Sequence, residues 1–267
     1  MNTSYAEVDV YNDRIVAYVT DSPQRILCQI DSLQQEHQTG KTIIYSIKVN
    51  EPTLRRNGYQ LEGKIDGLFN GQQGYVFSKF YNKERKTSNH ANDQEKIREI
   101  AARDKKKILE PLEQGISIEV FRGDDHELAS LASLYQKVFD KYPTNIFDIE
   151  YIKKSMNDNY FFVVAKHDEK IVCVASAAIN QFHSAEITDC AADPDYRGKN
   201  LLIHVIRELE TQLKRRNIYH FYSLTRAISP GMNLTIKRLG YTYQGTLVKN
   251  CVIGTGFEDM NIWTKQV

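Results

Sequence analysis

The 267-residue sequence predicts an α/β fold in which a smaller, related domain precedes the main one. Three observations support this prediction. Strand and helix patterns alternate through residues 115–267. A highly charged stretch, residues 83–109, interrupts the hydrophobic patterning, and part of the chain's ending recurs before it. We therefore expect a smaller domain over residues 1–82, a charged helical linker over 83–114 and the main domain over 115–267.

The composition excludes several classes of protein. Hydrophobic residues make up 41% of the chain and charged residues 26%, which is typical of a globular protein. The formal net charge of +1 gives no field that favours nucleic acid or an anionic membrane. No run approaches the roughly 18 apolar residues of a membrane span, and residues 1–10 have no signal-peptide core. We therefore expect a cytoplasmic protein that binds neither nucleic acid nor a membrane. The sequence is compatible with a homodimer.

The cysteines do not form a metal-binding pattern. Cys28, Cys173, Cys190 and Cys251 are scattered, without a C-x-x-C pair or the ligand spacing of a zinc site. We expect them to be reduced and mostly buried, and we expect no metal.

The main domain is read from hydrophobic periodicity and glycine stops. Strands are expected at 117–122, at 184–192, at 219–226, at 242–250, at 259–265 and, as a pair around the turn 167–170, within 160–180. Helices are expected at 125–142, 201–216 and 232–239. In the charged stretch, Ser88 or Asn89 could cap a helix from about Asp93. The run Lys105–Lys107 is either a solvated face or an anion contact.

The first part contains a partial copy of the chain's ending. Residues 55–65 read RRNGYQLEGKI and residues 237–247 read KRLGYTYQGTL. A helix from Ser22 to about His37 would correspond to the helix 201–216. These matches indicate an internal duplication. The first copy has no counterpart of the run Arg197-Gly198-Lys199, so we interpret it as a scaffold.

The stretch DCAADPDYRGKNLL, residues 189–202, predicts an anion-binding turn between a strand and a helix. A helix N-terminus presents unpaired N–H groups and the positive end of the helix dipole, which suits a pyrophosphate. Gly198 permits close approach of the backbone, and Arg197 and Lys199 add positive charge.

In this context the sequence resembles the GNAT N-acetyltransferases, whose cofactor loop has the pattern Arg/Gln-x-x-Gly-x-Gly/Ala. Arg197 matches the first position, whereas Asn200 and Leu202 replace the two small residues. Asn tolerates a positive φ, so the loop geometry can survive. The resemblance implies a mixed, mostly antiparallel sheet flanked by helices, and acetyl-CoA as co-substrate. It places acetyl-CoA against Cys190, Ala191, Ala192, Arg197, Gly198, Lys199, Asn200, Leu201, Leu202 and Asn233.

A closer resemblance, over most of the chain, is to the beta-lysine N-acetyltransferases of bacteria and archaea. It is carried by YPTNIFDIEY (142–151), AEITDCAADPDYRGK (185–199), LTRAISPGMN (224–233), GYTYQGTLVKN (240–250), EDMNIWTK (258–265) and NGYQLEGKIDGLFNG (57–71). This resemblance implies transfer of acetyl to the ε-amine of β-lysine, whose product is a compatible solute. The alternatives are acetylation of protein lysines and a non-catalytic acetyl-CoA-binding regulator.

Two carboxylates are candidates for the chemistry. An alkyl ammonium has a pKa of about 10.4 and must lose a proton before it attacks a thioester. Glu186 matches the Glu that acts as base in a similar AEI strand of histone-type GNAT enzymes, and Asp189 could bind the second ammonium. Residues three apart point to opposite faces of a strand, so both reach one site only if a bulge intervenes. Otherwise either carboxylate could simply pair with Arg226 or Lys199.

The remaining site residues are assigned by chemistry. Backbone N–H groups of residues 190–192 could stabilise the oxyanion. Ile236 stands where many GNAT enzymes have a Tyr acid, which leaves Tyr222, Tyr241 or water. A substrate carboxylate calls for an arginine, and Arg226 is our candidate. The polar candidates for the acceptor pocket are Asn145, Asp148, Asn250, Glu258 and Asn261.

Overall fold

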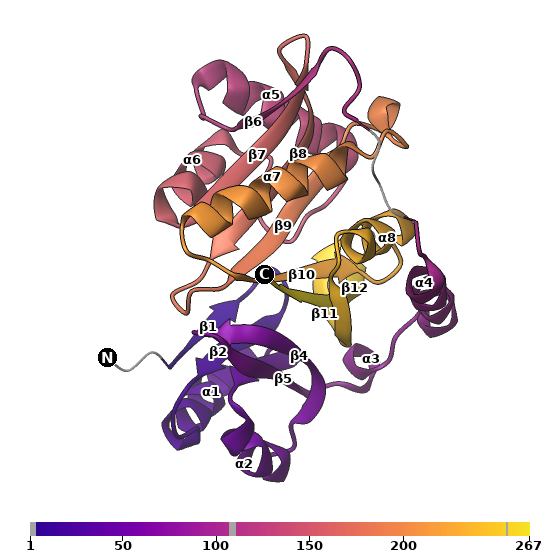
Figure 1. Cartoon of the computed structure of the whole chain (residues 1–267). Helices are drawn as coiled ribbons and strands as arrows, with labels where there is room; N and C mark the ends of the chain where they lie inside the picture. Colours follow the sequence, from indigo (N-terminus) through magenta and orange to yellow (C-terminus); the bar gives the residue numbers. More distant parts are fainter. Residues whose placement is uncertain (1–3, 107–110, 255) are drawn as a thin grey trace.

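The first half of the chain, residues 5–80, folds into five strands, two α-helices and one 3-10 turn. Its elements are β1 (Tyr5–Asp9), β2 (Arg14–Val19), α1 (Gln24–His37), β3 (Lys41–Ser46), the 3-10 turn η1 (Lys48–Asn50), α2 (Glu51–Arg56), β4 (Gln60–Phe69) and β5 (Gln72–Phe80). Two helices, α3 (Lys83–Lys86) and α4 (Ala91–Arg103), follow within the charged stretch. Figure 1 shows this half in indigo and purple.

The second half, residues 116–266, alternates strands and helices. Its elements are β6 (Ile116–Val120), α5 (Asp125–Val138), α6 (Ile149–Asp158), β7 (Tyr160–His167), β8 (Lys170–Ile179), β9 (Ala185–Ala192), η2 (Pro194–Tyr196), α7 (Leu201–Arg215), β10 (His220–Arg226), α8 (Pro230–Arg238), β11 (Thr242–Ile253) and β12 (Gly256–Gln266). The structure is a computed structural model, and it describes residues 4–106, 111–254 and 256–267.

All strands of the described residues belong to one sheet. Its order is β1-β2-β3-β5-β4-β11-β12-β10-β9-β8-β7-β6. The neighbours are antiparallel except for the parallel pairs β2–β3 and β9–β10. The predicted mixed, mostly antiparallel sheet with flanking helices is therefore confirmed. Because the sheet runs through both halves, the boundary at residues 83–114 stays a prediction.

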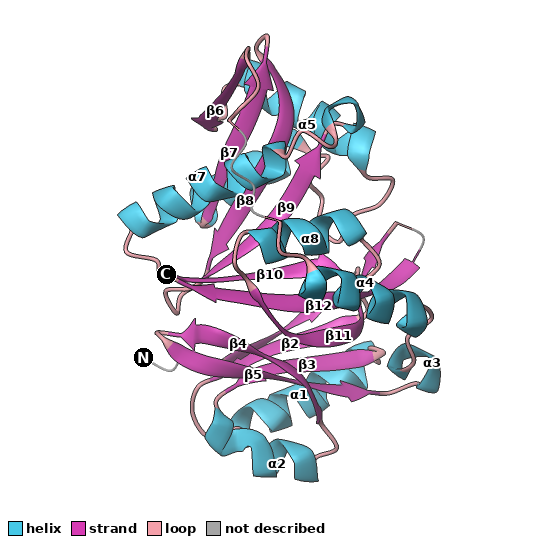
Figure 2. Cartoon of the chain, turned by 45° about the vertical axis from the view of Figure 1, so that its right-hand side comes forward, coloured by secondary structure: helices cyan, strands magenta, loops and turns pink. Residues whose placement is uncertain are grey.

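The two halves repeat one arrangement of strands around a central seam. Outward from the seam, β4, β5, β3, β2 and β1 follow the same sequence of pairings as β11, β12, β10, β9 and β8. In each half only the fourth of these strands is parallel to the third. Figure 2 shows β4 beside β11, with α1 and α2 on the outer face of the first half. This repeated topology is the one that the two similar sequence segments indicate.

Two glycines make the seam possible. Gly63 on β4 pairs with Gly245 on β11, and each occupies the equivalent place in the repeated segment. A Cβ on Gly245 would lie 2.3 Å from the Glu62 carbonyl oxygen and 2.6 Å from the Gly63 Cα. The φ of Gly245 is also +147°, which L side chains rarely adopt. The backbones of the two halves therefore approach too closely for any side chain.

A bulge in β11 is held by basic side chains that precede the second half. The register with β12 shifts between Leu247 and Cys251, which leaves residues 248–250 outside the ladder. Lys41 Nζ donates to the Val248 carbonyl at 2.7 Å. Arg85 Nε donates to the Lys249 carbonyl at 2.9 Å, and Arg14 Nη1 donates to the Asn250 carbonyl at 2.9 Å. We call this set of three donors and three carbonyls the β11 clamp.

A buried ion pair completes the clamp. Lys41 is fully buried and lies 2.8 Å from Glu62, whose other oxygen accepts from the Val248 N–H at 2.8 Å. Burial lowers the pKa of Lys41, and the charge of Glu62 opposes that shift. The pair is stabilising only because both charges also bond the bulge, since an unpaired buried charge is costly.

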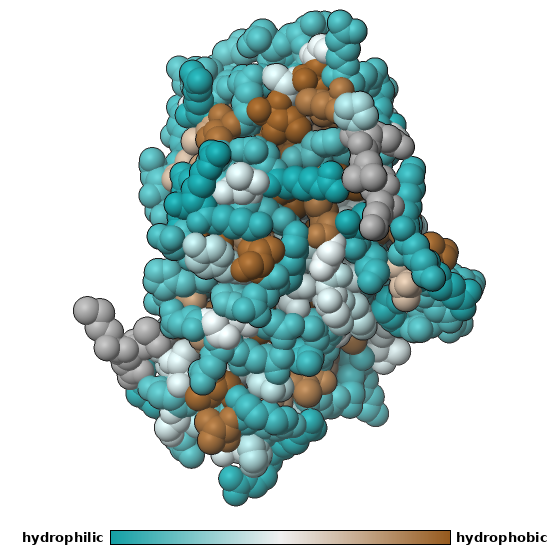
Figure 3. Space-filling view, viewed as in Figure 1, coloured by the Kyte–Doolittle hydropathy of each residue, from teal (hydrophilic) through white to brown (hydrophobic). Residues whose placement is uncertain are grey.

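Four apolar clusters hold the helices and the halves together. Helices α1 and α2 cover β2, β3 and β5 of the first half, while α5 and α6 cover β7 and β8 on one face of the second. Helices α7 and α8 cover the opposite face. A fourth cluster, which we call the inner cluster, joins the halves; its buried members are Ile43, Tyr45, Ile65, Leu68, Phe69, Val76, Phe182, Tyr222, Leu247, Cys251, Ile253, Met260 and Ile262. Figure 3 shows that the outer surface on this side is mostly hydrophilic, with separate hydrophobic patches.

Several expected boundaries differ from the structure. The helix expected over 125–142 ends at Val138, and α6, which we did not predict, begins after the N-cap Asp148. Helix α4 begins at Ala91 without a side-chain cap, while the Ser88 hydroxyl accepts from the His90 N–H. Lys107 of the basic run lies outside the described residues. No helix in the described ranges is long and apolar enough to cross a membrane.

The seam predicts a position-specific effect of alanine. Gly245→Ala should lower the free energy of unfolding by at least about 1–3 kcal/mol, because the new Cβ overlaps backbone atoms of β4. Gly256→Ala is the matched control, since a Cβ there meets nothing within 4 Å. Urea denaturation midpoints measure both. Equal midpoints for the two variants would contradict the close approach.

Candidate acetyl-transfer site

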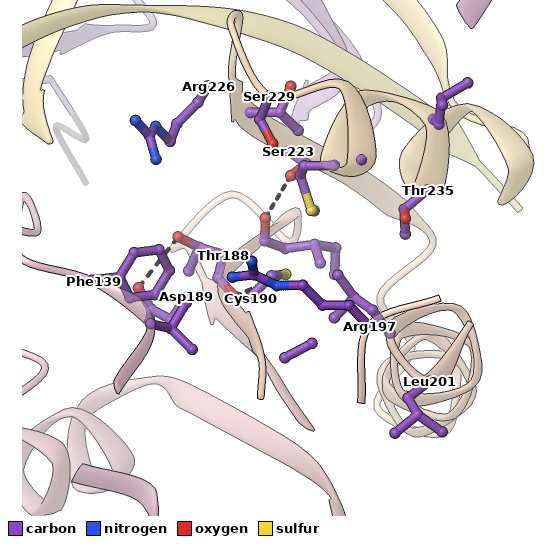
Figure 4. Close-up of a pocket in the computed structure, with 18 of the residues that line it drawn as sticks. Phe139, Thr188, Asp189, Cys190, Arg197, Leu201, Ser223, Arg226, Ser229 and Thr235 are labelled. Atoms are coloured by element: carbon purple, nitrogen blue, oxygen red, sulfur yellow. Dashed lines mark hydrogen bonds between the residues drawn. The ribbon is translucent and has the colours of Figure 1, made fainter. Parts of the chain in front are cut away.

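The site begins where two parallel strands separate. Strands β9 and β10 pair only at Ala185–Phe221 and Glu186–Tyr222 and then diverge. Ser223 Oγ, on the far side of the gap, donates to the Ile187 carbonyl at 2.7 Å. A cavity of about 590 Å³ occupies the opening between the strands. In Figure 4, Thr188, Asp189 and Cys190 lie between Arg197 and Leu201 on one side and Phe139 and Arg226 on the other.

The turn before α7 has the geometry of an anion cradle. Asn200 caps the helix in the left-handed conformation, with φ 57° and ψ 19°, and Gly198 has φ 83°. A Cβ on Gly198 would meet nothing within 4 Å, so this glycine serves the backbone angle. Within the described ranges, the N–H groups of Gly198, Leu201 and Leu202 have no hydrogen-bond acceptor. These donors at a helix N-terminus fit a pyrophosphate.

The departures from the loop pattern are accommodated locally. Asn200 takes the backbone angle of the glycine that it replaces. Leu202 packs partly against the core beneath α7 and also lines the cavity. Arg197, Gly198 and Leu201 line the cavity as well. Lys199 does not, because it pairs with Glu113 at 2.8 Å and lies over the Tyr196 ring.

A bulge in β9 places the two candidate carboxylates on one face. Asp189 has φ 47°, and the register with β8 shifts between Val174 and Ser176. Before the bulge, Ile187 packs in the core beneath α7. After the bulge, Cys190 packs there, although strict alternation along the strand would have placed Asp189 there. Because the alternation reverses, Glu186 and Asp189 share the face away from α7. The bulge that the spacing of these carboxylates required is present.

The electrostatics of this face favour a base that works near neutral pH. Burial raises the pKa of Glu186 to about 7, and the negative charge of Asp189 adds to the rise. The charge of Arg14 and a hydrogen bond from Tyr222 oppose it. Burial also raises the pKa of Asp189, against hydrogen bonds from Ser176 and other hydroxyls. Ser176 Oγ donates to Asp189 Oδ2 at 2.7 Å.

Tyrosines on this face could supply a proton. Burial, followed by the charge of Glu186, raises the pKa of Tyr222 well above its ordinary value, so its hydroxyl keeps its proton. Tyr142 lines the cavity and hydrogen-bonds Asp189. Tyr241, by contrast, is buried beneath α7 near Glu210 and does not line the cavity. Ile236 is fully buried in the same core.

Arg226 lines the cavity but has a carboxylate partner already. Its Nε and Nη2 donate to the two oxygens of Glu258 at 2.7 and 2.6 Å. The pair is therefore bidentate, and neither Glu186 nor Asp189 takes part in it. Its role as a ligand for the acceptor stays a prediction.

Other predicted site residues are placed away from the cavity. Asn233 is fully buried: its Nδ2 donates to the Arg226 and Ser229 carbonyls, and its Oδ1 accepts from Trp263 at 3.0 Å. It therefore supports the start of α8 instead of facing the cofactor. Asn145 is exposed beside Asp148, which caps α6. Ala191, Glu186, Asn250 and Asn261 do not line the cavity either; of the two carboxylates on the shared face, Asp189 lines it and Glu186 does not.

Asn250 nevertheless has an unusual environment. Its side chain is buried, and within the described part of the chain its Oδ1 has no hydrogen-bond partner. Its backbone carbonyl belongs to the β11 clamp. A buried acceptor without a donor is costly, which indicates a position that a ligand group could satisfy. No cluster of three or more His, Cys, Asp or Glu side chains in the described ranges could hold a metal ion.

Comparisons with known proteins agree with this geometry. Residues 128–241 match the Acetyltransferase (GNAT) family. N-acetyltransferase YodP of Bacillus subtilis (strain 168) is 34% identical, over 99% of this chain and 96% of that protein. This chain belongs to the GNAT acetyltransferase family. As a GNAT enzyme, it is an N-acetyltransferase that uses acetyl-CoA to acetylate an amine.

Further similarities concern the acceptor and the fold. The beta-lysine N(6)-acetyltransferase of Methanosarcina mazei is 32% identical, over 91% of this GNAT chain and 97% of the relative. Its counterpart in Methanococcus maripaludis is 30% identical, over 99% and 97%. A ribosomal-protein-alanine N-acetyltransferase structure from Brucella melitensis covers 57% of this chain and 99% of its own, with a TM-score of 0.50 and 18% identity. That likeness shows the GNAT fold.

The cradle predicts that the left-handed residue matters for the cofactor. Asn200→Ala should cost roughly 1–2 kcal/mol of stability, because alanine is strained at φ 57°. It should also raise the KM for acetyl-CoA roughly tenfold, as one charge-assisted hydrogen bond is lost. Steady-state kinetics with a fixed acceptor measure the second effect.

Asn217→Ala is the matched control for this experiment. Asn217 is exposed after α7, has φ 62° and does not line the cavity. The control should lose similar stability and keep the KM for acetyl-CoA. The same KM increase in both variants would contradict the cradle.

Proposed function

We propose that this enzyme transfers acetyl from acetyl-CoA to the ε-amine of β-lysine or a related small diamino acid, and so makes N6-acetyl-β-lysine, a compatible solute. The observation that carries the proposal is the bulge at Asp189, which brings two carboxylates to one face of β9, with Asp189 lining the cavity. The 30% and 32% identity to two beta-lysine N(6)-acetyltransferases over nearly the full chain supports this acceptor.

Glu186 acts as the general base. A carboxylate with a pKa of about 7 is largely ionised just above neutrality and still takes a proton readily. It removes a proton from the ε-ammonium, and the free amine attacks the thioester carbonyl. Asp189 binds the second ammonium of the acceptor and keeps the local potential negative. Such a potential favours a dication over a neutral amine.

The backbone and a tyrosine complete the transfer. Beyond Glu186 the edge of β9 that faces β10 has no ladder partner, so backbone groups near residues 190–192 are available to the oxyanion. As the carbon–sulfur bond breaks, the thiolate must gain a proton. We assign this proton to Tyr222, an assignment supported by its hydrogen bond to Glu186 and its raised pKa. The residues Arg197, Gly198, Leu201 and Leu202 hold the pyrophosphate end.

Enclosure of the acceptor face favours a small acceptor over a peptide. The loop after α5 is bonded to the first half, since Asn12 Nδ2 donates to the Pro143 carbonyl at 3.3 Å. An extended peptide would need an open groove along this face. Acceptor profiling decides the matter: coenzyme A release should be fast with β-lysine and slow with lysine-containing peptides. Faster release with a peptide would contradict the proposal, and binding of acetyl-CoA without turnover of any amine would indicate a regulator.

The pH dependence tests the base. Below about pH 7, kcat/KM should fall about tenfold per pH unit as Glu186 becomes protonated. Glu186→Gln should lower the rate and remove this acidic limb of the pH profile, that is, the fall of kcat/KM below about pH 7. The acceptor amine titrates identically in both enzymes, so the difference between their profiles isolates Glu186.

Asp189→Asn is the companion variant. It removes a negative charge that raises the pKa of Glu186, so the limb should persist and move to lower pH. If Asp189→Asn instead abolishes the limb while Glu186→Gln only shifts it, Asp189 is the base.

A further inference from the structure

We infer that Arg14, on β2 of the first half, receives the carboxylate of the acceptor. The inference rests on the proposed function, because it concerns the acceptor end of the same site. It gives the first half, which the sequence indicates is a scaffold, a direct part in selecting the substrate.

The first half forms a wall opposite the catalytic face. The tip of the β1–β2 hairpin is held on two sides: Asn12 bonds the Pro143 carbonyl, and its Oδ1 accepts from the Val252 N–H at 2.8 Å. The inner cluster continues this contact, since Val16 and Tyr18 of β2 pack in it with Leu224 of β10. The inward face of β2 therefore lies across from β9 and β10.

Aromatic rings line this wall. The Tyr18 ring stacks on Tyr45 at 4.7 Å between centroids and lies 5.9 Å from the Phe182 ring. Burial raises the pKa of both tyrosines, and the negative charge of Glu186 raises it further. Tyr45 also packs in the inner cluster with Tyr222, which pairs with Glu186 where β9 meets β10.

Arg14 is preorganised on the same wall. Its Nε donates to Asp9 Oδ2 and its Nη1 to the Asn250 carbonyl, both at 2.9 Å. Its Nη2 donates to no acceptor in the described ranges, and the side chain keeps 17% of its surface exposed. A guanidinium fixed on two sides with N–H groups to spare loses little entropy when it binds a carboxylate.

Position distinguishes Arg14 from Arg226. Arg14 shares the inward face of β2 with Val16 and Tyr18, which pack in the inner cluster with Tyr222, the ladder partner of Glu186. Arg226 is four residues beyond Tyr222 on β10, and Glu258 occupies its Nε–Nη2 edge. An acceptor whose ε-amine is at Glu186 can therefore direct its carboxylate to Arg14.

Asn250 supplies a second polar group at this end. Its carbonyl holds Arg14, and its buried Oδ1 lacks a donor in the described part of the molecule. A diamino acid carries an ammonium close to its carboxylate. Asp189 takes one of the three N–H donors of that ammonium, and the Asn250 amide oxygen is an acceptor for another. The pairing of an arginine with an orphan acceptor fits an amino acid better than a simple diamine.

The test compares two acceptors that differ only in the carboxylate. β-Lysine and 1,4-diaminopentane carry the same two amines at the same spacing. Arg14→Gln should lower kcat/KM for β-lysine at least about tenfold, and lower kcat/KM for 1,4-diaminopentane less than about threefold. With β-lysine, kcat/KM of Arg14→Lys should lie between those of the wild type and Arg14→Gln. Lysine keeps the positive charge but lacks the two parallel N–H donors of the guanidinium.

Two further arginines serve as matched controls. Arg85→Gln removes the neighbouring bond of the β11 clamp and should change the two acceptors equally. Arg226→Gln tests the rival arginine. Equal loss for both acceptors in Arg14→Gln, or selective loss of β-lysine in Arg226→Gln, would overturn the inference. If Arg14→Gln does not fold, the same comparison is made with Arg14→Lys.

The outcome for the wild type separates this inference from the proposed function. If the wild type does not acetylate β-lysine, the proposed acceptor fails, and lysine is compared with 1,5-diaminopentane instead. Selective loss with that pair supports Arg14 on its own. If no acceptor with a carboxylate is used, Arg14 has no such role.

Discussion

The β11 clamp is the interaction on which the acceptor side depends. Three consecutive carbonyls leave the ladder at residues 248–250, and each accepts a hydrogen bond from a basic side chain. Unpaired buried carbonyls would be costly, so the bulge exists only because Lys41, Arg85 and Arg14 arrive from earlier in the chain. The second half could not hold this shape alone.

A second irregularity, the bulge in β9, determines how the two candidate catalytic carboxylates are arranged. An ideal strand would turn either Glu186 or Asp189 into the core beneath α7. The left-handed backbone at Asp189 reverses the alternation, and the charge of Asp189 then adds to the cost of ionising Glu186. Strain at a non-glycine residue is expected where function needs it.

Local sequence predicted what local physics determines. The strand-to-helix turn, the left-handed Asn200 and the repeated Gly-Tyr segments were readable, because each depends on neighbours in the chain. Helix α6 was missed because the short amphipathic run after Asp148 resembles a loop. The saturated amide of Asn233 could not be predicted either, since its partners come from three separate segments.

The least predictable feature was the contribution of the first half. Arg14 has no motif around it, and its contact with Asn250 spans 236 positions. The pairing of Gly63 with Gly245 and the inner cluster bring those segments together. A close approach of backbones is visible in sequence as a pair of glycines, but the side chains that it brings together are not.

The repeated topology separates two tasks along the chain. The cofactor cradle lies wholly within the second half, at residues 197–202, whereas the wall opposite the carboxylates belongs to β2 and β3. In the proposed function that wall faces the acceptor, so changes on it leave residues 197–202 untouched. A duplicated half that has no cradle of its own is thereby free to diverge, and enzymes with this architecture can acquire new amine preferences without rebuilding their catalytic half.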